Sequence, residues 1–549
     1  MKSHTPDAHG LSHQWLVSTW TVLRGRLSGL FAEFPEALPV VFRALRSVHR
    51  ARTTSGPTVR RFDFERRYLR QLLIGDGDEA LYRGASFGVA QAPTSLEYGA
   101  TRGILFPASV PNANYLGVSQ FVAEALSRHQ AAGSSADGGP ATEGRRSGPF
   151  ERGRLGEALW LMPRNLVQRH SGLSSWSSAP LARVDVGPLR VGEAAQRRAS
   201  SLFAAIDGLL LPLLDRADAA AMMRYLHRAA CLEIVCRCAR LRSLIEGLGV
   251  AEVFVPNEQI EPMAIAVAAA QRAGVSSRQH LHGLESELYV PFLVRETWVW
   301  DPRSFARMAG FGASSERLAI VGNLEVGYWG RWFLTVTERG AGRDGDRRSP
   351  HTALDASVRR DRSAPSMRSS RPSGRGARRC CLFLAQFHGG AGSANPFLRG
   401  FELLVRSIAV AGGWRLRLRQ HPFSPADPLV DAALRDAASA IEVEIAPSSE
   451  PLAPQILESD CVLTVSSSGI AIAHAFGRTT GLLWLPEIEA LFGPPLVSVD
   501  HVLRCDADVT HLLHHVPERR EVDRDRVAAW VADLESRVID RLADHPTRR

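Results

Sequence analysis

The feature that most constrains the fold is an alternation of short apolar runs with segments of helical spacing, which fills the sequence from residue 380 to residue 484. The apolar runs predict strands at 380–387, 414–420, 441–445, 461–465 and 480–484. The helical spacing predicts helices at 397–411, 428–438, 452–458 and 469–476. Strands and helices that alternate at this interval form a parallel sheet covered by helices on both faces. We therefore predict a Rossmann-like domain over 380–515, followed by a C-terminal helical region over 516–549.

A second α/β series precedes this domain. The pattern predicts strands at 252–255, 276–280, 297–300 and 317–321, and helices at 219–247, 260–273 and 303–309. Two stretches without hydrophobic periodicity, 131–154 and 338–379, are rich in Gly, Ser, Pro and charge, and we expect both to be disordered. The predicted organisation is an elaborated N-terminal region over 1–130, an α/β lobe over 155–337, an interlobe linker over 338–379, and the Rossmann-like lobe. Within the N-terminal region there are weak strand signals at 87–90 and 103–106. The fold class is α/β with two Rossmann-like lobes and a cleft between them.

Length and composition agree with two lobes of a soluble protein. A chain of 549 residues exceeds what one hydrophobic core supports, and its 45% hydrophobic and 22% charged residues are near globular averages. The net charge is +9 and almost all of the cations are arginine, a side chain suited to phosphate. The arginines are spread along the chain without a nucleic-acid-binding signature, so we expect no nucleic acid partner. The seven cysteines lack metal-ligand spacing and are interpreted as buried reduced thiols.

The N-terminal region offers two interpretations. Residues 15–45 combine bulky apolar side chains with Arg24, Arg26 and Arg43, and Pro35 and Pro39 interrupt them. Such a segment predicts either a basic helix on an anionic membrane surface or a helix packed on the N-terminal lobe. We find no secretory leader pattern and no apolar run of bilayer-spanning length, so the expected location is the cytoplasm, with peripheral membrane contact as the alternative.

In open α/β sheets the ligand binds at the carboxyl ends of the strands, so the residues just after each strand are candidates. In the first series, His280, His282 and Gly283 end and follow the strand at 276–280, where histidine can bind phosphate or move a proton. The alternative is a histidine packed at a strand end. Asn323 follows the strand at 317–321 and on its own indicates a turn.

The second series has two candidate positions. The strand at 414–420 ends in His421-Pro422, and its arginines at 415, 417 and 419 share one face, of which we expect at least two to be solvated or helix-covered. The strand at 461–465 leads into Ser466, Ser467, Ser468 and Gly469 at the start of a helix. Hydroxyls and backbone N–H groups at such a place predict a phosphate site, whereas an unliganded helix cap is the alternative.

Four glutamates near the strand ends of the first series are candidates for a general base. They are Glu258, Glu261, Glu285 and Glu287, and the sequence does not choose among them. No convincing cluster of metal ligands accompanies them, because Asp76-Gly77-Asp78 is typical of a turn. We expect no metal and no cofactor.

Four stretches together resemble the GT-B-fold enzymes of bacterial surface-carbohydrate synthesis, namely polysialyltransferases, capsule transferases and CDP-glycerol glycerophosphotransferases. They are AEVFVPNEQIEPMAIAVAAAQRAGVSSRQHLHG ending at Gly283, WVWDPRSFARMAGFGASSERLAIVGN ending at Asn323, LRLRQHP ending at Pro422, and SDCVLTVSSSGIAIAHAFG ending at Gly477. The resemblance implies a nucleotide-activated donor on the C-terminal lobe and a polysaccharide or lipid-linked acceptor against the N-terminal lobe.

The resemblance also implies roles for individual residues. His421 would bind donor phosphate or assist the leaving group. The three serines would hold nucleotide phosphate, with Gly469, Pro422 and Arg419 beside them. His282 would contact phosphate or serve as base. Glu258 is the candidate base, and His280, Gly283, Glu285 and Asn323 are expected on the acceptor side.

Two departures from the family pattern affect the donor. Members commonly carry a glutamate five residues before the glycine that corresponds to Gly477, and this glutamate bonds the ribose. They also carry a proline shortly after that glycine. In this chain the two places hold Ile472 and Thr479. The main hypothesis is a glycosyltransferase-like enzyme that transfers a sugar or a glycerol-phosphate-like unit. The alternatives are a non-catalytic nucleotide- or glycan-binding scaffold and, with less support, a sugar-nucleotide epimerase, for which no spacing of carboxylates and histidine is found.

Overall fold

The structure is a computed structural model that describes most of the chain. The described residues are 8–53, 87–89, 103–107, 113–136, 158–163, 192–217, 219, 228–258, 261–281, 285, 287–341, 378–385, 396–420, 428–446, 450–492, 494–495 and 499–543. The chain divides into two compact units. The N-terminal unit comprises Ser12–Glu325 with Asp533–Arg549, and the C-terminal unit comprises Val326–Ala532 with Met1–Leu11.

The C-terminal unit is built on a parallel sheet of six described strands in the order β10-β9-β8-β11-β12-β13. Their bounds are β8 (Arg379–Ala385), β9 (Trp414–Gln420), β10 (Val443–Ala446), β11 (Cys461–Thr464), β12 (Thr479–Leu483) and β13 (His501–Leu503). Counted along the chain from β8, this order is 3-2-1-4-5-6, the order of the Rossmann fold. Strand order reverses between β8 and β11, and the carboxyl ends at such a reversal are where open α/β sheets bind ligands.

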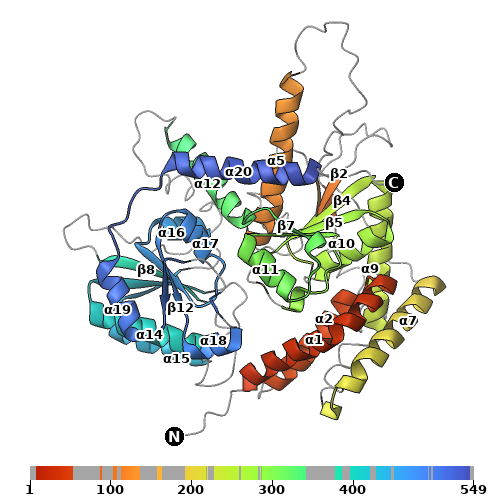
Figure 1. The fold of residues 1–549 in the computed structure, drawn as a ribbon, viewed down its shortest axis with the longest axis horizontal. Helices are drawn as coiled ribbons and strands as arrows, with labels where there is room; N and C mark the ends of the chain where they lie inside the picture. Colours follow the sequence, from red (N-terminus) through yellow and green to blue (C-terminus); the bar gives the residue numbers. More distant parts are fainter. Residues whose placement is uncertain are drawn as a thin grey trace, which may run out of the picture. The chain divides into compact units, whose positions relative to one another are not determined.

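Helices cover both faces of this sheet (Figure 1). One face carries α14 (Pro396–Ala411), α15 (Pro428–Ala440), α18 (Pro486–Phe492) and α19 (Asp506–His515). The other carries α16 (Leu452–Leu457) and α17 (Ile470–Ala475). Because both faces are covered, the central strand β8 is apolar after Arg379, and every residue from Cys380 to Ala385 is buried.

The N-terminal unit contains a seven-stranded sheet in the order β1-β3-β2-β4-β5-β6-β7. Its strands are β1 (Phe87–Val89), β2 (Gly103–Pro107), β3 (Ala158–Pro163), β4 (Val250–Val255), β5 (Ser276–His280), β6 (Glu296–Val299) and β7 (Leu318–Ile320). β1 pairs antiparallel with β3, and the other pairs are parallel. Strand order reverses between β2 and β4. The two Rossmann-like lobes predicted from the sequence are therefore confirmed.

Helix α10 (Glu261–Arg272) lies at the centre of the N-terminal unit. Its apolar residues from Met263 to Ala270 are buried, because it packs on the sheet and is itself covered by α2 (Ala37–Thr53) and α9 (Arg228–Gly247). Alanine occupies much of this helix, and small side chains allow neighbouring elements to approach on several sides. α7 (Glu193–Leu210) packs on α9 and α2.

The N-terminal helices belong to the same core. Trp20, Leu23 and Leu27 on α1 (Ala8–Glu33) are fully buried, and the Trp20 Nε1 donates to the Val290 carbonyl at 2.6 Å. Of the two interpretations of residues 15–45, the packed helix is the one that the structure shows, although the segment forms two helices. No helix in the described ranges is long and apolar enough to cross a bilayer.

A buried carboxylate ties three helices of this unit together. Glu36, just before α2, is fully buried and accepts from Arg198 Nε at 2.7 Å and Nη2 at 2.9 Å. The same carboxylate accepts from Arg272 of α10 at 2.8 Å. The bidentate bond raises the pKa of Arg198, and the two guanidinium groups hold α7 and α10 to the start of α2.

Helices α12 (Leu324–Ala341) and α20 (Arg524–Ala543) each pass from one unit to the other. In the C-terminal unit they cross at Gly330, where a Cβ would lie 2.1 Å from the Trp530 ring. In the N-terminal unit, Gly322 has φ +113° and a Cβ there would lie 2.3 Å from the Leu534 side chain. Glycine is required at both places, at the second for backbone conformation as well as for space.

The predicted segment boundaries differ from the structure in several places. α5 (Ala113–Ala136) continues into the stretch expected to be disordered from residue 131, and α12 continues past residue 338. The remainder of both stretches, residues 137–157 and 342–377, lies outside the described residues. β1 and β2 form one sheet with the strands of the predicted 155–337 lobe. Six of the seven cysteines are buried as expected, whereas Cys505 is exposed at the start of α19.

Candidate functional site

The serine turn after β11 lies at the reversal point of the C-terminal sheet. The Ser467 N–H donates to Thr464 Oγ1 at 3.0 Å, and the Thr464 hydroxyl donates to the Leu384 carbonyl on β8 at 2.7 Å. The Ser467 hydroxyl oxygen accepts from the Gly469 N–H at 3.2 Å, which leaves its own proton available to a ligand. The turn is therefore fixed to the two central strands while Ser466 and Ser467 remain partly exposed.

Gly469 is required by close packing beneath this turn. A Cβ at this position would lie 2.9 Å from Leu452 Cδ2 and 3.1 Å from Leu384 Cδ1. Ser468 is buried, so Ser466 and Ser467 are the members of the cluster that reach solvent. α17 begins directly after the glycine and contains six residues.

Arg419 lies level with this turn on the other side of β8. Strand register pairs Leu384 with Arg419 of β9 and with Thr464 of β11, so the two flanking backbones are about 10 Å apart. Arg419 Nη1 donates to Gln455 Oε1 at 2.9 Å, and burial lowers the pKa of its guanidinium to about 10 while the Glu450 carboxylate opposes that shift. Arg419 is thus a cation at neutral pH beside the serine turn.

The other two arginines of β9 form ion pairs inside the unit. Arg417 bonds Glu458 at 2.8 Å and Glu444 at 3.1 Å, and Arg415 bonds Glu444 at 3.0 Å. Arg415 and Arg417 are thus engaged in ion pairs on their own face of the sheet. His421 and Pro422, which follow β9, lie outside the described residues.

Ile472 occupies the place of the ribose-binding glutamate of the resembled family, and it is fully buried. Its side chain is part of the core beneath α17, so the helix presents no carboxylate to a ligand at this position. The polar side chain of α17 that reaches solvent is His474, whose Nδ1 lies 3.4 Å from an Asp500 carboxylate oxygen.

In the N-terminal unit, Glu258 follows β4 beside the second reversal point and is 1% exposed. Its carboxylate accepts from the backbone N–H groups of Leu293, at 2.9 and 3.1 Å, and Val294, at 2.8 Å. Gln279 of β5 completes the network by accepting from the Glu258 N–H at 3.1 Å and donating to the Thr297 hydroxyl at 3.0 Å. Burial raises the pKa of Glu258 to about 7 against these bonds, which lower it. The carboxylate holds the segment before β6 in place.

His280 joins the ends of β5 and β7. Its Nε2 lies 3.0 Å from the Gly322 carbonyl and 3.3 Å from the Leu324 N–H, and which of the two it bonds depends on the tautomer. Burial lowers the pKa of His280 to about 4, so the ring is neutral at physiological pH. Asn323, in the same turn, accepts from the Glu325 N–H at 3.0 Å and caps α12. This arrangement is that of a histidine packed at a strand end.

The remaining candidates of this unit are partly described. Glu285 is buried and accepts a hydrogen bond from the Ser304 hydroxyl of α11 (Pro302–Gly310), whose first turn Asp301 caps at 2.7 Å. Glu287 begins the short helix η3 (Glu287–Tyr289), and Glu261 begins α10. His282 and Gly283 lie outside the described residues, as does the Asp76–Asp78 pair. Among the described residues, no group of three or more His, Cys, Asp and Glu side chains could hold a metal ion.

A glycine-rich stretch follows β8 and is not among the candidate residues named from the sequence. β8 is the first strand of the Rossmann order, and the chain between it and α14 contains Gly389, Gly390 and Gly392. A glycine-rich stretch after the first strand is typical of phosphate-binding turns in this fold. These residues lie outside the described ones.

Comparison with known proteins shows a likeness in structure alone. No family model matches the chain, and no curated protein sequence matches it. Among solved structures, UDP-GlcNAc 2-epimerase from Neisseria meningitidis bound to UDP-GlcNAc is 12% identical with a TM-score of 0.41, over 79% of this chain and 100% of that one. UDP-GlcNAc 2-epimerase from Methanocaldococcus jannaschii is 10% identical with a TM-score of 0.43, over 79% and 99%.

A glycosyltransferase from Rickettsia africae is 8% identical with a TM-score of 0.40, over 81% of this chain and 96% of that one. At these identities and TM-scores the likenesses carry no conclusion about ligand or reaction. The two-lobed fold rests instead on the strand orders of this chain.

Proposed function

We propose that this protein is a glycosyltransferase-like enzyme that transfers a sugar, or a glycerol-phosphate-like unit, from a nucleotide-activated donor to a surface polysaccharide or glycolipid acceptor. The observation that carries the proposal is that Arg419 and the strand leading to the Ser466–Ser468 turn flank β8 on opposite sides. A cation and hydroxyl donors at the reversal point of a Rossmann sheet suit the phosphate groups of a nucleotide.

In the proposed sugar transfer the acceptor hydroxyl attacks the donor carbon that carries the nucleotide phosphate, and the bond between that carbon and the phosphate oxygen breaks. For a glycerol-phosphate-like unit the hydroxyl instead attacks the phosphorus of that unit, and the bond from this phosphorus to the oxygen of the nucleotide phosphate breaks. In both cases the charge that develops on the leaving phosphate is stabilised by Arg419 and the Ser467 hydroxyl. A general base takes the acceptor proton. His282 is our candidate for this base and His421 for a further phosphate contact, both from the family resemblance. Because its carboxylate is already bonded to two backbone N–H groups, we assign Glu258 a positioning role.

Nucleotide binding tests the first step. In a thermal-shift titration with UDP, CDP and CMP, we expect one of them to raise the melting temperature, since a ligand of the native state stabilises it. Replacing Ser467 with alanine removes one hydroxyl contact and should weaken binding by about 1 kcal/mol, or roughly 5-fold. Ser439→Ala is the matched control, because the hydroxyl of this exposed serine of α15 donates to the Asp436 carbonyl at 2.6 Å. If no nucleotide binds, or if both variants bind equally well, the site is wrongly placed.

A second function, a non-catalytic nucleotide- or glycan-binding scaffold, is favoured by the burial of Ile472. The two functions are separated by incubating the protein with nucleotide-sugars and bacterial glycan acceptors and following the products by NMR. Release of the nucleotide with a new glycosidic bond supports the transferase. Tight binding without turnover supports the scaffold, and a changed sugar configuration without transfer would identify an epimerase.

A further inference from the structure

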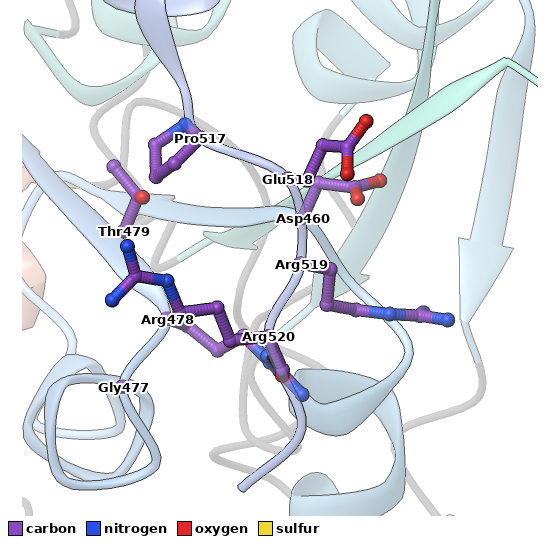
Figure 2. A pocket seen from close by; sticks show the side chains of 8 residues that line it. All are labelled: Asp460, Gly477, Arg478, Thr479, Pro517, Glu518, Arg519 and Arg520. Carbon is purple, nitrogen blue, oxygen red and sulfur yellow. Dashed lines mark hydrogen bonds between the residues drawn. The ribbon is translucent and has the colours of Figure 1, made fainter.

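A cavity lies at the amino-terminal edge of the C-terminal sheet, opposite the serine turn. It has a volume of about 210 Å³ and is bounded by the starts of β11 and β12 and by the segment that leads from α19 to α20. Figure 2 shows the side chains around it. The polar residues of the lining are Asp460, Arg478, Thr479, Glu518, Arg519 and Arg520. The proposed function makes no use of this edge.

Arg478 is the buried cation of this cavity. It is 5% exposed, and its Nη1 and Nη2 donate to the carbonyls of Arg520, at 2.7 Å, and Leu457, at 3.0 Å. No described group accepts from its Nε, and the carboxylate that acts electrostatically on it is that of Asp460. A buried guanidinium whose hydrogen bonds go to neutral carbonyls keeps a charge that is only partly compensated, which is unfavourable in a protein interior.

The neighbouring groups leave this charge in excess. Arg519 and Arg520 add two exposed guanidinium groups to the lining, against the carboxylates of Asp460 and Glu518. Asp460 is already engaged, because its Oδ2 accepts from the Cys380 N–H at 2.7 Å. Burial and then the Arg519 charge lower the pKa of Arg478 to about 10 while the Asp460 carboxylate opposes that shift, so the side chain stays protonated at neutral pH. The missing component is an anion.

We propose that this cavity binds a phosphate group, either as inorganic phosphate or as a small phosphate monoester, on Arg478 with Arg519 and Arg520. Three guanidinium groups supply the hydrogen-bond donors that phosphate oxygens accept, and the Thr479 hydroxyl is available beside them. Because Arg478 directly precedes β12 and the other two arginines belong to the 517–520 segment, a bound phosphate would fasten that segment to the sheet. The segment leads directly into α20, so occupancy would steady the start of that helix.

Isothermal titration of the full chain with inorganic phosphate tests the proposal, with sodium chloride at equal ionic strength as the reference. We expect saturable binding that the Arg519→Ala/Arg520→Ala double variant weakens about 10-fold or more, since each bond to a charged group contributes about 1.5–3 kcal/mol. Both side chains are exposed, so the double variant should fold. Arg526→Ala, an exposed arginine at the start of α20 that does not line the cavity, should bind like the wild type.

Hydrogen exchange supplies a second readout that does not depend on affinity. Phosphate should slow exchange of the backbone amides at 518–522 in the wild type and leave them unchanged in the double variant. Glycerol 3-phosphate and glucose 1-phosphate, titrated in parallel, distinguish a monoester from free phosphate by which binds more tightly. Absence of saturable phosphate binding, or a double variant with wild-type affinity, would overturn the proposal, and the cavity would then hold only water.

Discussion

Replacing Glu258 with glutamine should make the stability of the N-terminal unit less dependent on pH. Burial raises the pKa of Glu258 from 4.5 to about 7. An acid whose pKa is higher in the folded than in the unfolded chain binds its proton more tightly when folded. Its contribution to stability is therefore complete below about pH 4.5 and is lost as the pH rises through 7. A shift of this size corresponds to about 3 kcal/mol.

Glutamine has the shape of the protonated acid and cannot ionise, so E258Q avoids that loss. Wild type and variant should unfold at similar temperatures near pH 5, and the variant should be the more stable of the two near pH 8. Glu252 and Glu325 carry pKa values raised by burial to about 7 and about 8, so part of the slope will remain in the variant. Differential scanning calorimetry at intervals of about one pH unit measures the effect.

The control is Glu193→Gln, which removes an exposed carboxylate from α7 and should leave the wild-type slope unchanged. The reasoning is refuted if E258Q retains the full wild-type slope, or if it unfolds at a much lower temperature than the wild type at pH 8. The second result would mean that the ionised carboxylate stabilises Leu293 and Val294 by more than its burial costs. Loss of turnover at unchanged stability would instead support a catalytic role.

Two further substitutions test the packing. Glu36→Gln removes the charge shared by two arginines and should lower the unfolding free energy by about 3 kcal/mol, whereas exposed Glu33→Gln should change it by less than about 0.5 kcal/mol, both measured by chemical denaturation. Equal effects would show that the triad contributes little. Gly322→Ala combines a positive φ with a Cβ only 2.3 Å from the Leu534 side chain and should lower the melting temperature by several degrees, while Gly310→Ala, whose Cβ would have nothing within 4 Å, should not. An unaltered Gly322→Ala melting temperature would contradict the tight packing of α20 on this turn.

Local patterns in the sequence predicted much of the fold. The strands at 276–280 and 414–420 were predicted with the bounds that the structure shows, and the helix starts near 261, 396 and 428 were placed within one residue. These elements have clear apolar periodicity and are flanked by glycine or proline. β13 and α19 were missed, since a three-residue strand with two exposed positions has no period to detect.

Long-range pairing was outside the reach of those patterns. Nothing in the sequence near β2 indicates that it lies between β3 and β4, because strand order depends on contacts between distant segments. The strand at 380–387 was predicted as the first of the Rossmann-like domain, whereas the glycines that follow it were not among the candidate site residues. The serine turn was found because a strand, hydroxyl residues and a helix follow one another directly. The backbone partners of Glu258 are 35 and 36 residues away in the sequence, so no local pattern indicates them.

The burial of α1 limits how this chain could attach to a membrane. Trp20, Leu23 and Leu27 already occupy the core, and each would forfeit roughly 1.5–3 kcal/mol of burial if the helix detached to enter a lipid interface. Lipid would have to compensate that loss before any net adhesion resulted. The face left for a peripheral contact is the one with Val22 and Arg26, which are exposed. Adhesion through this region would thus depend on ionic strength and anionic lipid rather than on insertion of the apolar stripe.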